Sequence, residues 1–147
     1  MIFVPLKIHI LATVKAGSVY YFEEERLSSP EPHYFIVVNK NPKTDQVLLL
    51  VCASSQVEKR KDAIKKLNFA EETLALVSPK ECPCFNKNTA IDCNTIWEKT
   101  SQSVIEKLSN GELRVCPDEI PSEIVEKLVK GVLMSNQVSE DIKALIR

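Results

Sequence analysis

The order of apolar and polar positions separates a strand-like first half of the chain from a helical last third. Two apolar runs of strand length cover residues 33–38 and 47–53, and the segment 39–46 between them is polar and rich in turn-forming residues. This arrangement predicts an antiparallel hairpin. Because both runs are apolar on both faces, we expect the hairpin to lie at the centre of a sheet.

Shorter segments with strand-like patterns lie on either side of this hairpin. Residues 6–10 alternate between apolar and polar side chains, which predicts a half-buried strand containing His9. Further short strands are predicted at 17–22, 73–77, 89–93 and 113–116. An acidic run, Glu23–Glu25, falls in the loop that follows residue 22, and we expect it to be solvated.

Helical periodicity occurs in four segments. Ser55 and Glu58 have the spacing of a capping box and predict a helix that runs to about residue 67. The apolar stripe of this helix consists of Val57, Ala63, Ile64 and Leu67. Further helices are predicted at 101–108, from Pro121 onward and at 139–147. Strands followed by helices predict an α+β fold with a barrel-like sheet.

The composition narrows the class of protein. A chain of 147 residues with 44% hydrophobic positions suits one domain over residues 1–147 and is too apolar for a disordered protein. The 19 basic and 20 acidic side chains leave a net charge of −1, which excludes a protein held to nucleic acid by bulk charge. The three glycines are far apart, which excludes glycine-rich phosphate loops.

The sequence also bears on cellular location. No segment approaches the ~20 apolar residues of a membrane helix, and the apolar start lacks the basic region of a signal peptide. Five cysteines, an odd number, are typical of a reduced protein rather than of a disulfide scaffold. We therefore expect a soluble cytoplasmic protein without membrane contact.

Four of the cysteines could together surround a zinc ion. Cys82 and Cys84 form a C-x-C pair, and Cys93 and Cys116 lie downstream. Common zinc modules use cysteine pairs with wider spacing, and a cysteine in a strand-like run is usually a small buried apolar residue. The pattern favours structural thiols, without a metal or other cofactor. A zinc-stabilised structural protein is an alternative that metal analysis would distinguish.

One histidine and two serines carry the most specific chemistry. His33 stands at the start of a central strand, where an imidazole can exchange protons with a substrate or can cap the end of the sheet. Ser54 and Ser55 lie where a buried strand passes into a helix, and hydroxyls and free backbone N–H groups at a helix start favour a phosphate. The capping box accounts for Ser55 but not for Ser54.

The predicted helix that follows these serines has a basic face. Lys59, Arg60 and Lys61 are followed by two further lysines, so that five positive charges fall within eight residues. Such a face is either a solvated helix surface or a site for a nucleic-acid backbone. Unpaired bases would also favour an aromatic platform such as Tyr20 or Tyr34.

Several short strings, taken in order, resemble the MazF/PemK family of toxin endoribonucleases from bacterial toxin–antitoxin pairs. They are KAGSVYY at 15–21, PHYFIVVN at 32–39, LLVCASSQ at 49–56 and FNKNTAIDCNTI at 85–96. The amphipathic helix near the C-terminus fits as well, so the resemblance covers about residues 15–146. The chain departs from the family pattern at the start of the second string, where the usual Arg-Pro pair is replaced by His33 and Tyr34.

The resemblance implies a small SH3-like antiparallel β-barrel with attached helices, in a homodimer that binds single-stranded RNA in its groove and pairs with a cognate antitoxin protein. It also implies RNA cleavage without a metal or other cofactor. Carried over by position, the family's basic residue falls on His33 and its hydroxyl on Ser54 or Ser55, which are therefore the candidate catalytic residues. The candidate RNA-binding residues are Tyr34, Gln56, Lys59, Arg60 and Lys61. A non-catalytic SH3-like barrel that binds RNA or a protein partner is the alternative.

Overall fold

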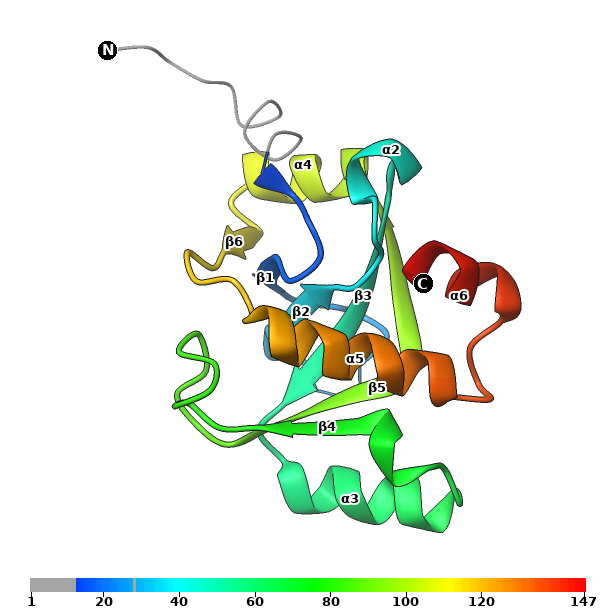
Figure 1. Ribbon diagram of the computed structural model, residues 1–147. Coiled ribbons are helices and arrows are strands. Elements are labelled where there is room, and N and C mark those ends of the chain that lie inside the picture. Colours follow the sequence, from blue (N-terminus) through cyan, green and yellow to red (C-terminus); the bar gives the residue numbers. More distant parts are fainter. Residues whose placement is uncertain (1–12, 28) are drawn as a thin grey trace.

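The computed structural model describes residues 13–147 apart from residue 28, so the strand predicted at 6–10, with His9, lies outside the described residues. Within the described part, the strands are β1 (Val19–Phe22), β2 (His33–Val37), β3 (Val47–Ser54), β4 (Leu74–Val77), β5 (Thr89–Thr100) and β6 (Leu113–Val115). They form one antiparallel sheet in the order β4-β5-β3-β2-β1-β6 (Figure 1).

The helices of the described part surround this sheet. They are α2 (Pro42–Asp45), α3 (Val57–Lys66), α4 (Ser101–Ser109), α5 (Ser122–Met134) and α6 (Glu140–Ile146), and a short 3-10 helix, η1 (Glu71–Thr73), precedes β4. The predicted α+β class is thus confirmed. The sheet is open, with β4 and β6 at its two edges, so closure into a barrel is not confirmed. None of the described helices is long and apolar enough to cross a membrane.

The predicted central hairpin is confirmed. The strands β2 and β3 are antiparallel neighbours in the middle of the sheet, and the segment between them contains the short helix α2. Asn39, which is fully buried, organises this connection. Its amide nitrogen donates to the Val47 carbonyl at 2.8 Å and to Asp45 Oδ2 at 3.0 Å, while its oxygen accepts from the backbone N–H of Leu49 at 3.1 Å.

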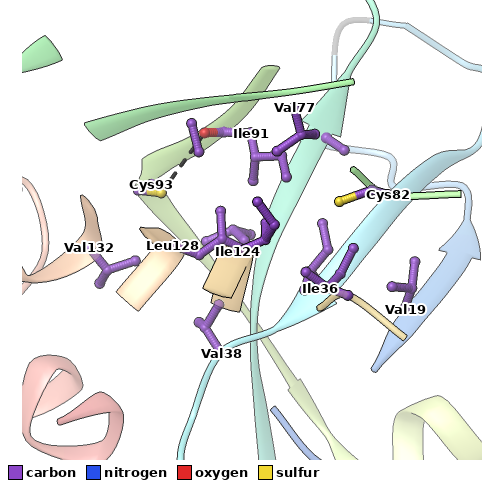
Figure 2. Close-up of a cluster of buried hydrophobic side chains, with 14 of the residues drawn as sticks. Val19, Ile36, Val38, Val77, Cys82, Ile91, Cys93, Ile124, Leu128 and Val132 are labelled. Atoms are coloured by element: carbon purple, nitrogen blue, oxygen red, sulfur yellow. Dashed lines mark hydrogen bonds between the residues drawn. The ribbon is translucent and has the colours of Figure 1, made fainter. Parts of the chain in front are cut away.

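Both faces of the sheet are covered, which explains why the central runs are apolar on both sides. Helix α5 lies across the first face, and Figure 2 shows the apolar cluster there. Its buried members include Ile36, Val38, Ile91, Ile124, Leu128 and Val132. The cluster on the second face lies against α4 and includes Phe22, Phe35, Leu48, Leu50, Val104 and Ile105.

Helix α5 approaches the sheet closely at Gly131. A Cβ atom at this position would lie 2.8 Å from the carbonyl oxygen of Glu72 and 2.9 Å from the Sγ atom of Cys93. Cys93 is itself fully buried. The missing side chain of Gly131 therefore sets the distance between the helix and β5 at this point.

Strand β5 runs for 12 residues, where the sequence predicted five at its beginning. Its pairing with β3 is irregular, because Leu50 opposes Trp97 whereas Cys52 opposes Asp92. Residues 93–96 therefore stand opposite a single residue of β3. Such a bulge interrupts the alternation of inward and outward side chains. This interruption is the reason why the second half of β5 has no strand-like pattern.

Candidate functional site

A cleft of about 480 Å³ opens where β2 begins and β3 ends. The antiparallel register places Phe35 opposite Cys52, so that His33, two residues earlier, comes beside Ser54. All of the candidate catalytic and RNA-binding residues except Lys61 line this cleft. They are His33, Tyr34, Ser54, Ser55, Gln56, Lys59 and Arg60.

A neighbouring carbonyl fixes the tautomer of His33. The ring atom Nδ1 lies 2.8 Å from the main-chain oxygen of Glu31. Because a carbonyl can only accept a hydrogen bond, Nδ1 carries the proton in the neutral ring and Nε2 keeps its lone pair. The Nε2 atom of His33 is therefore able to take a proton from a bound hydroxyl group.

Two serines and the start of α3 form the next part of the cleft. Ser54 Oγ accepts a hydrogen bond from the backbone N–H of Gln56 at 3.2 Å. Gln56 precedes the first residue of α3, and no side chain of the described residues caps this helix. The predicted capping box of Ser55 and Glu58 is therefore wrong, because the hydroxyl of Ser54, one residue earlier, makes the hydrogen bond at this turn. The first N–H groups of α3 stay available to an anion.

Helix α3 contributes charge to the cleft rather than apolar surface to the core. Lys59 and Arg60 line the cleft, and Arg60 Nε is buried without a hydrogen-bond partner among the described residues. Lys61 is not part of the lining and pairs with Glu58 at 3.5 Å. The apolar stripe predicted for this helix is not buried in the core, since no residue of α3 is buried and Leu67 is 61% exposed.

Three aromatic rings, those of Tyr21, Tyr34 and Phe85, line the cleft and form an aromatic wall. The ring centres of Tyr21 and Tyr34 are 4.5 Å apart, and Phe85 meets Tyr34 edge-on at 5.4 Å. Tyr20, one of the two predicted platforms, is only 2% exposed and belongs to the core, so that prediction is wrong. The alternation of β1 could have identified its neighbour Tyr21 instead.

Sequence reasoning missed the part of the lining that comes from the segment before β5. Lys87 brings a third cation to the cleft, and Thr89 brings a further hydroxyl. Both lie there because Ala90 of β5 pairs with Ser54 of β3. A pairing between strands so far apart in the chain leaves no local pattern, so only the string at 85–96 pointed to this segment.

The loop between β1 and β2 also lines the cleft and is anchored by Glu24. The side chain of Glu24 is 5% exposed and pairs with Lys99 of β5 and with Arg26. Burial by itself raises the pKa of Glu24, but hydrogen bonds from Arg26 and Lys99 outweigh it and lower this pKa to about 2. The guanidinium of Arg26 also lies 4.7 Å from the ring centre of Trp97. The expectation of a solvated acidic run is therefore wrong for Glu24.

The cysteines lie in apolar surroundings. Cys82 and Cys93 are fully buried in the cluster beneath α5, and burial raises the pKa of both thiols, that of Cys93 to about 12. Burial and the neighbouring thiols, Cys116 first, raise the pKa of Cys84 to about 12. Burial therefore favours the neutral thiol form of these cysteines in the metal-free protein. In the part of the chain that the structure describes, no group of three or more His, Cys, Asp or Glu side chains could hold a metal ion.

Comparison with models of protein families finds no match for this chain, and comparison with curated proteins finds none either. The functional conclusion therefore depends on the geometry and the chemistry of the cleft.

Proposed function

We propose that the chain binds single-stranded RNA in this cleft and cleaves it without a metal, as a toxin-type endoribonuclease resembling the MazF/PemK family. The observation that carries the proposal is the convergence of a histidine, two serine hydroxyls, a helix start and three cations in one cleft. Cleavage by a ribose 2′-hydroxyl needs a proton acceptor, donors for the phosphorane and a proton for the leaving oxygen. The residues of the cleft can meet each of these needs.

His33 handles the proton in the proposed reaction. Its Nε2 atom accepts the proton of the 2′-hydroxyl as the 2′-oxygen attacks phosphorus. The bond from phosphorus to the 5′-oxygen then breaks, and the imidazolium returns the proton to that oxygen. The products are a 2′,3′-cyclic phosphate and a 5′-hydroxyl end. The hydroxyls of Ser54 and Ser55 and the first N–H groups of α3 donate hydrogen bonds to the phosphorane oxygens.

Three positive side chains supply the attraction that the net charge of the chain does not. Lys59 and Arg60 line the cleft from α3, and Lys87 lines it from the segment before β5. Arg60 brings a guanidinium to the cleft from a different element than the family's arginine, whose place His33 takes. Phosphates neutralised by such cations release counterions, so RNA binding at this site weakens as salt is added.

The resemblance extends this proposal to a cytoplasmic homodimer, a cognate antitoxin partner and an SH3-like barrel. The neighbouring antiparallel strands β5, β3, β2 and β1 are compatible with part of such a barrel. The aromatic wall suits unpaired bases, which bind proteins by stacking on such rings.

RNA binding without cleavage is the second candidate function. The aromatic wall and the three cations favour it, because they bind RNA without any proton transfer. The absence of an arginine at the start of β2 favours it as well, because histidine cannot form the bidentate phosphate contact of arginine.

A cleavage assay in the presence of EDTA tests the proposal and separates the two candidates. We expect the wild-type protein to cut a 5′-labelled single-stranded RNA to products ending in a cyclic phosphate. His33→Ala should lose about 100-fold or more in rate, because it lacks the proton acceptor. Lys61→Ala, whose side chain lies outside the lining, should cut as the wild type does.

The other outcomes are equally informative. Equal cleavage by wild type and His33→Ala would refute the role of His33. RNA binding without cleavage by the wild type would select the second candidate, and neither binding nor cleavage would overturn both. Expression in bacteria provides a parallel test, with growth arrest expected for the wild type and not for His33→Ala.

A further inference from the structure

A second, smaller cavity of about 150 Å³ adjoins the cleft. It shares His33, Ser54 and Arg60 with the cleft, so a ligand bound at the first cavity can extend into the second. The residues that line only the smaller cavity include Cys52, Asp92, Thr95 and Trp97. We call it the inner cavity.

The bulge in β5 creates the inner cavity. Leu50 opposes Trp97 and Cys52 opposes Asp92, so four residues of β5 stand opposite one residue of β3 beside the cavity. The second apolar cluster, against α4, belongs to the same face of the sheet, and Cys52 and Trp97 are partly buried against it. Bulges next to functional sites commonly direct a side chain into them.

The inner cavity offers one oriented acceptor. Asp92 Oδ1 accepts hydrogen bonds from the backbone N–H of Asn94 at 2.9 Å and from its side-chain nitrogen at 3.2 Å. Asn94 is in turn held by Thr73 at 2.8 Å and by Ser135 at 2.6 Å. This network fixes the Asp92 carboxylate, while its second oxygen has no hydrogen bond or ion pair to the described residues.

The same cavity also offers an unused donor. Arg60 lines it, and the guanidinium of Arg60, whose Nε atom is itself covered, has no hydrogen-bond or ion-pair partner among the described residues. Arg60 and Asp92 face one cavity without forming an ion pair within 4.0 Å. A ligand that carries both a donor and an acceptor would satisfy the two groups at once.

Resting on the proposed function, we propose that the inner cavity binds one base of the RNA and selects cytosine. The 4-amino group of cytosine is a donor that suits the Asp92 carboxylate, and its N3 and O2 atoms are acceptors that suit Arg60. A cavity of about 150 Å³ accommodates a single aromatic ring, which favours a pyrimidine over a purine. Uracil would place the O4 acceptor against the carboxylate of Asp92.

Trp97 supplies an apolar surface for the base. Its ring is held from two sides, by Phe35 at 6.0 Å edge-on and by the Arg26 guanidinium at 4.7 Å. A ring fixed in this way can contact a base without first being ordered, and aromatic contacts of this kind are a usual source of affinity for unpaired bases.

Fluorescence anisotropy tests the proposal with short RNAs that differ in one base within an adenine background. 2′-O-methyl sugars at every position of these RNAs remove the attacking hydroxyls, so that binding alone is measured. We expect the wild type to bind the cytosine RNA about tenfold more tightly than the uracil RNA. Replacing the cytosine by N4,N4-dimethylcytosine, which lacks the amino hydrogens, should remove this advantage without any change in the protein.

Asp92→Asn provides the matched protein variant. The asparagine keeps the oxygen that binds Asn94 but places an N–H donor where the second carboxylate oxygen was, so the preference should move toward uracil. Asp62→Asn, an equal charge change on the exposed face of α3, should keep the preference for cytosine.

Two results would overturn this inference alone, namely RNA binding without a base preference, or a cytosine preference that survives both N4 dimethylation and Asp92→Asn. No binding to any of the RNAs would overturn the proposed function together with it.

Discussion

Replacing Glu24 by glutamine should make the stability of the fold less dependent on pH. Glu24 is buried against Lys99 and Arg26, and their hydrogen bonds lower the pKa of its carboxyl group from 4.5 to about 2 despite its burial. The charged form is thus favoured in the folded state. Its contribution to stability is present above pH 4.5, the unfolded value, and is lost as the pH falls toward 2. Glutamine keeps the shape of the side chain but cannot titrate.

The size of the effect follows from the two pKa values. Integrated over pH, a shift of this size contributes about 3 kcal/mol at pH 6 and about 1 kcal/mol at pH 3. The difference in unfolding free energy between wild type and Glu24→Gln should therefore shrink by about 2 kcal/mol between these two pH values. The low exposure of Glu24 limits screening by water, so the term should persist at physiological salt.

Urea unfolding at pH 6, 5, 4 and 3 measures this difference directly. The single tryptophan, Trp97, lies against Arg26 and provides the fluorescence signal. Glu23→Gln is the matched control, because Glu23 is exposed, and its difference from the wild type should not change with pH. A constant difference between wild type and Glu24→Gln from pH 6 to pH 3 would refute the proposed anchoring of the loop.

Three further changes test other parts of the structure. Gly131→Ala should lower the free energy of unfolding by about 1 kcal/mol, because the clash with Cys93 and its surroundings outweighs the better helix propensity of alanine. A gain in stability toward urea would contradict this prediction. Asn39→Ala leaves buried backbone groups without partners and should lower the free energy of unfolding by about 2–4 kcal/mol in the same assay. A loss below about 0.5 kcal/mol would show that the turn does not need this amide. Lys87→Ala should weaken RNA binding and reduce the slope of log K against log salt concentration by about 0.7, whereas Lys61→Ala should leave this slope unchanged. An equal slope for both variants would show that Lys87 does not contact the RNA.

The central part of the fold could be predicted because its signals are local. The two apolar runs at 33–38 and 47–53 and the polar segment between them define a hairpin whatever surrounds it. The same antiparallel geometry brings His33 beside Ser54, so most of the candidate site followed from one correct pairing.

Features that depend on distant parts of the chain could not be predicted. Lys87 reaches the cleft through the pairing of β5 with β3, and the bulge in that pairing has no periodic pattern. The sequence pattern predicts a solvated Glu24, because nothing local indicates that Lys99, far along the chain, lies beside it. The predicted helix start at Ser55 lies one residue before the actual one at Gln56, because a shift of one residue is within the precision of such patterns.

The shallow seating of α3 has an evolutionary consequence. This helix carries Lys59 and Arg60 into the cleft, yet it buries none of its residues in the core. Substitutions at exposed positions of α3 such as Lys59 usually change stability by less than about 0.5 kcal/mol. Selection can therefore rewrite the charges that face a ligand from α3 while β2, β3 and α5 hold the fold. Ligand preference can change in this protein without a loss of stability that other positions must compensate.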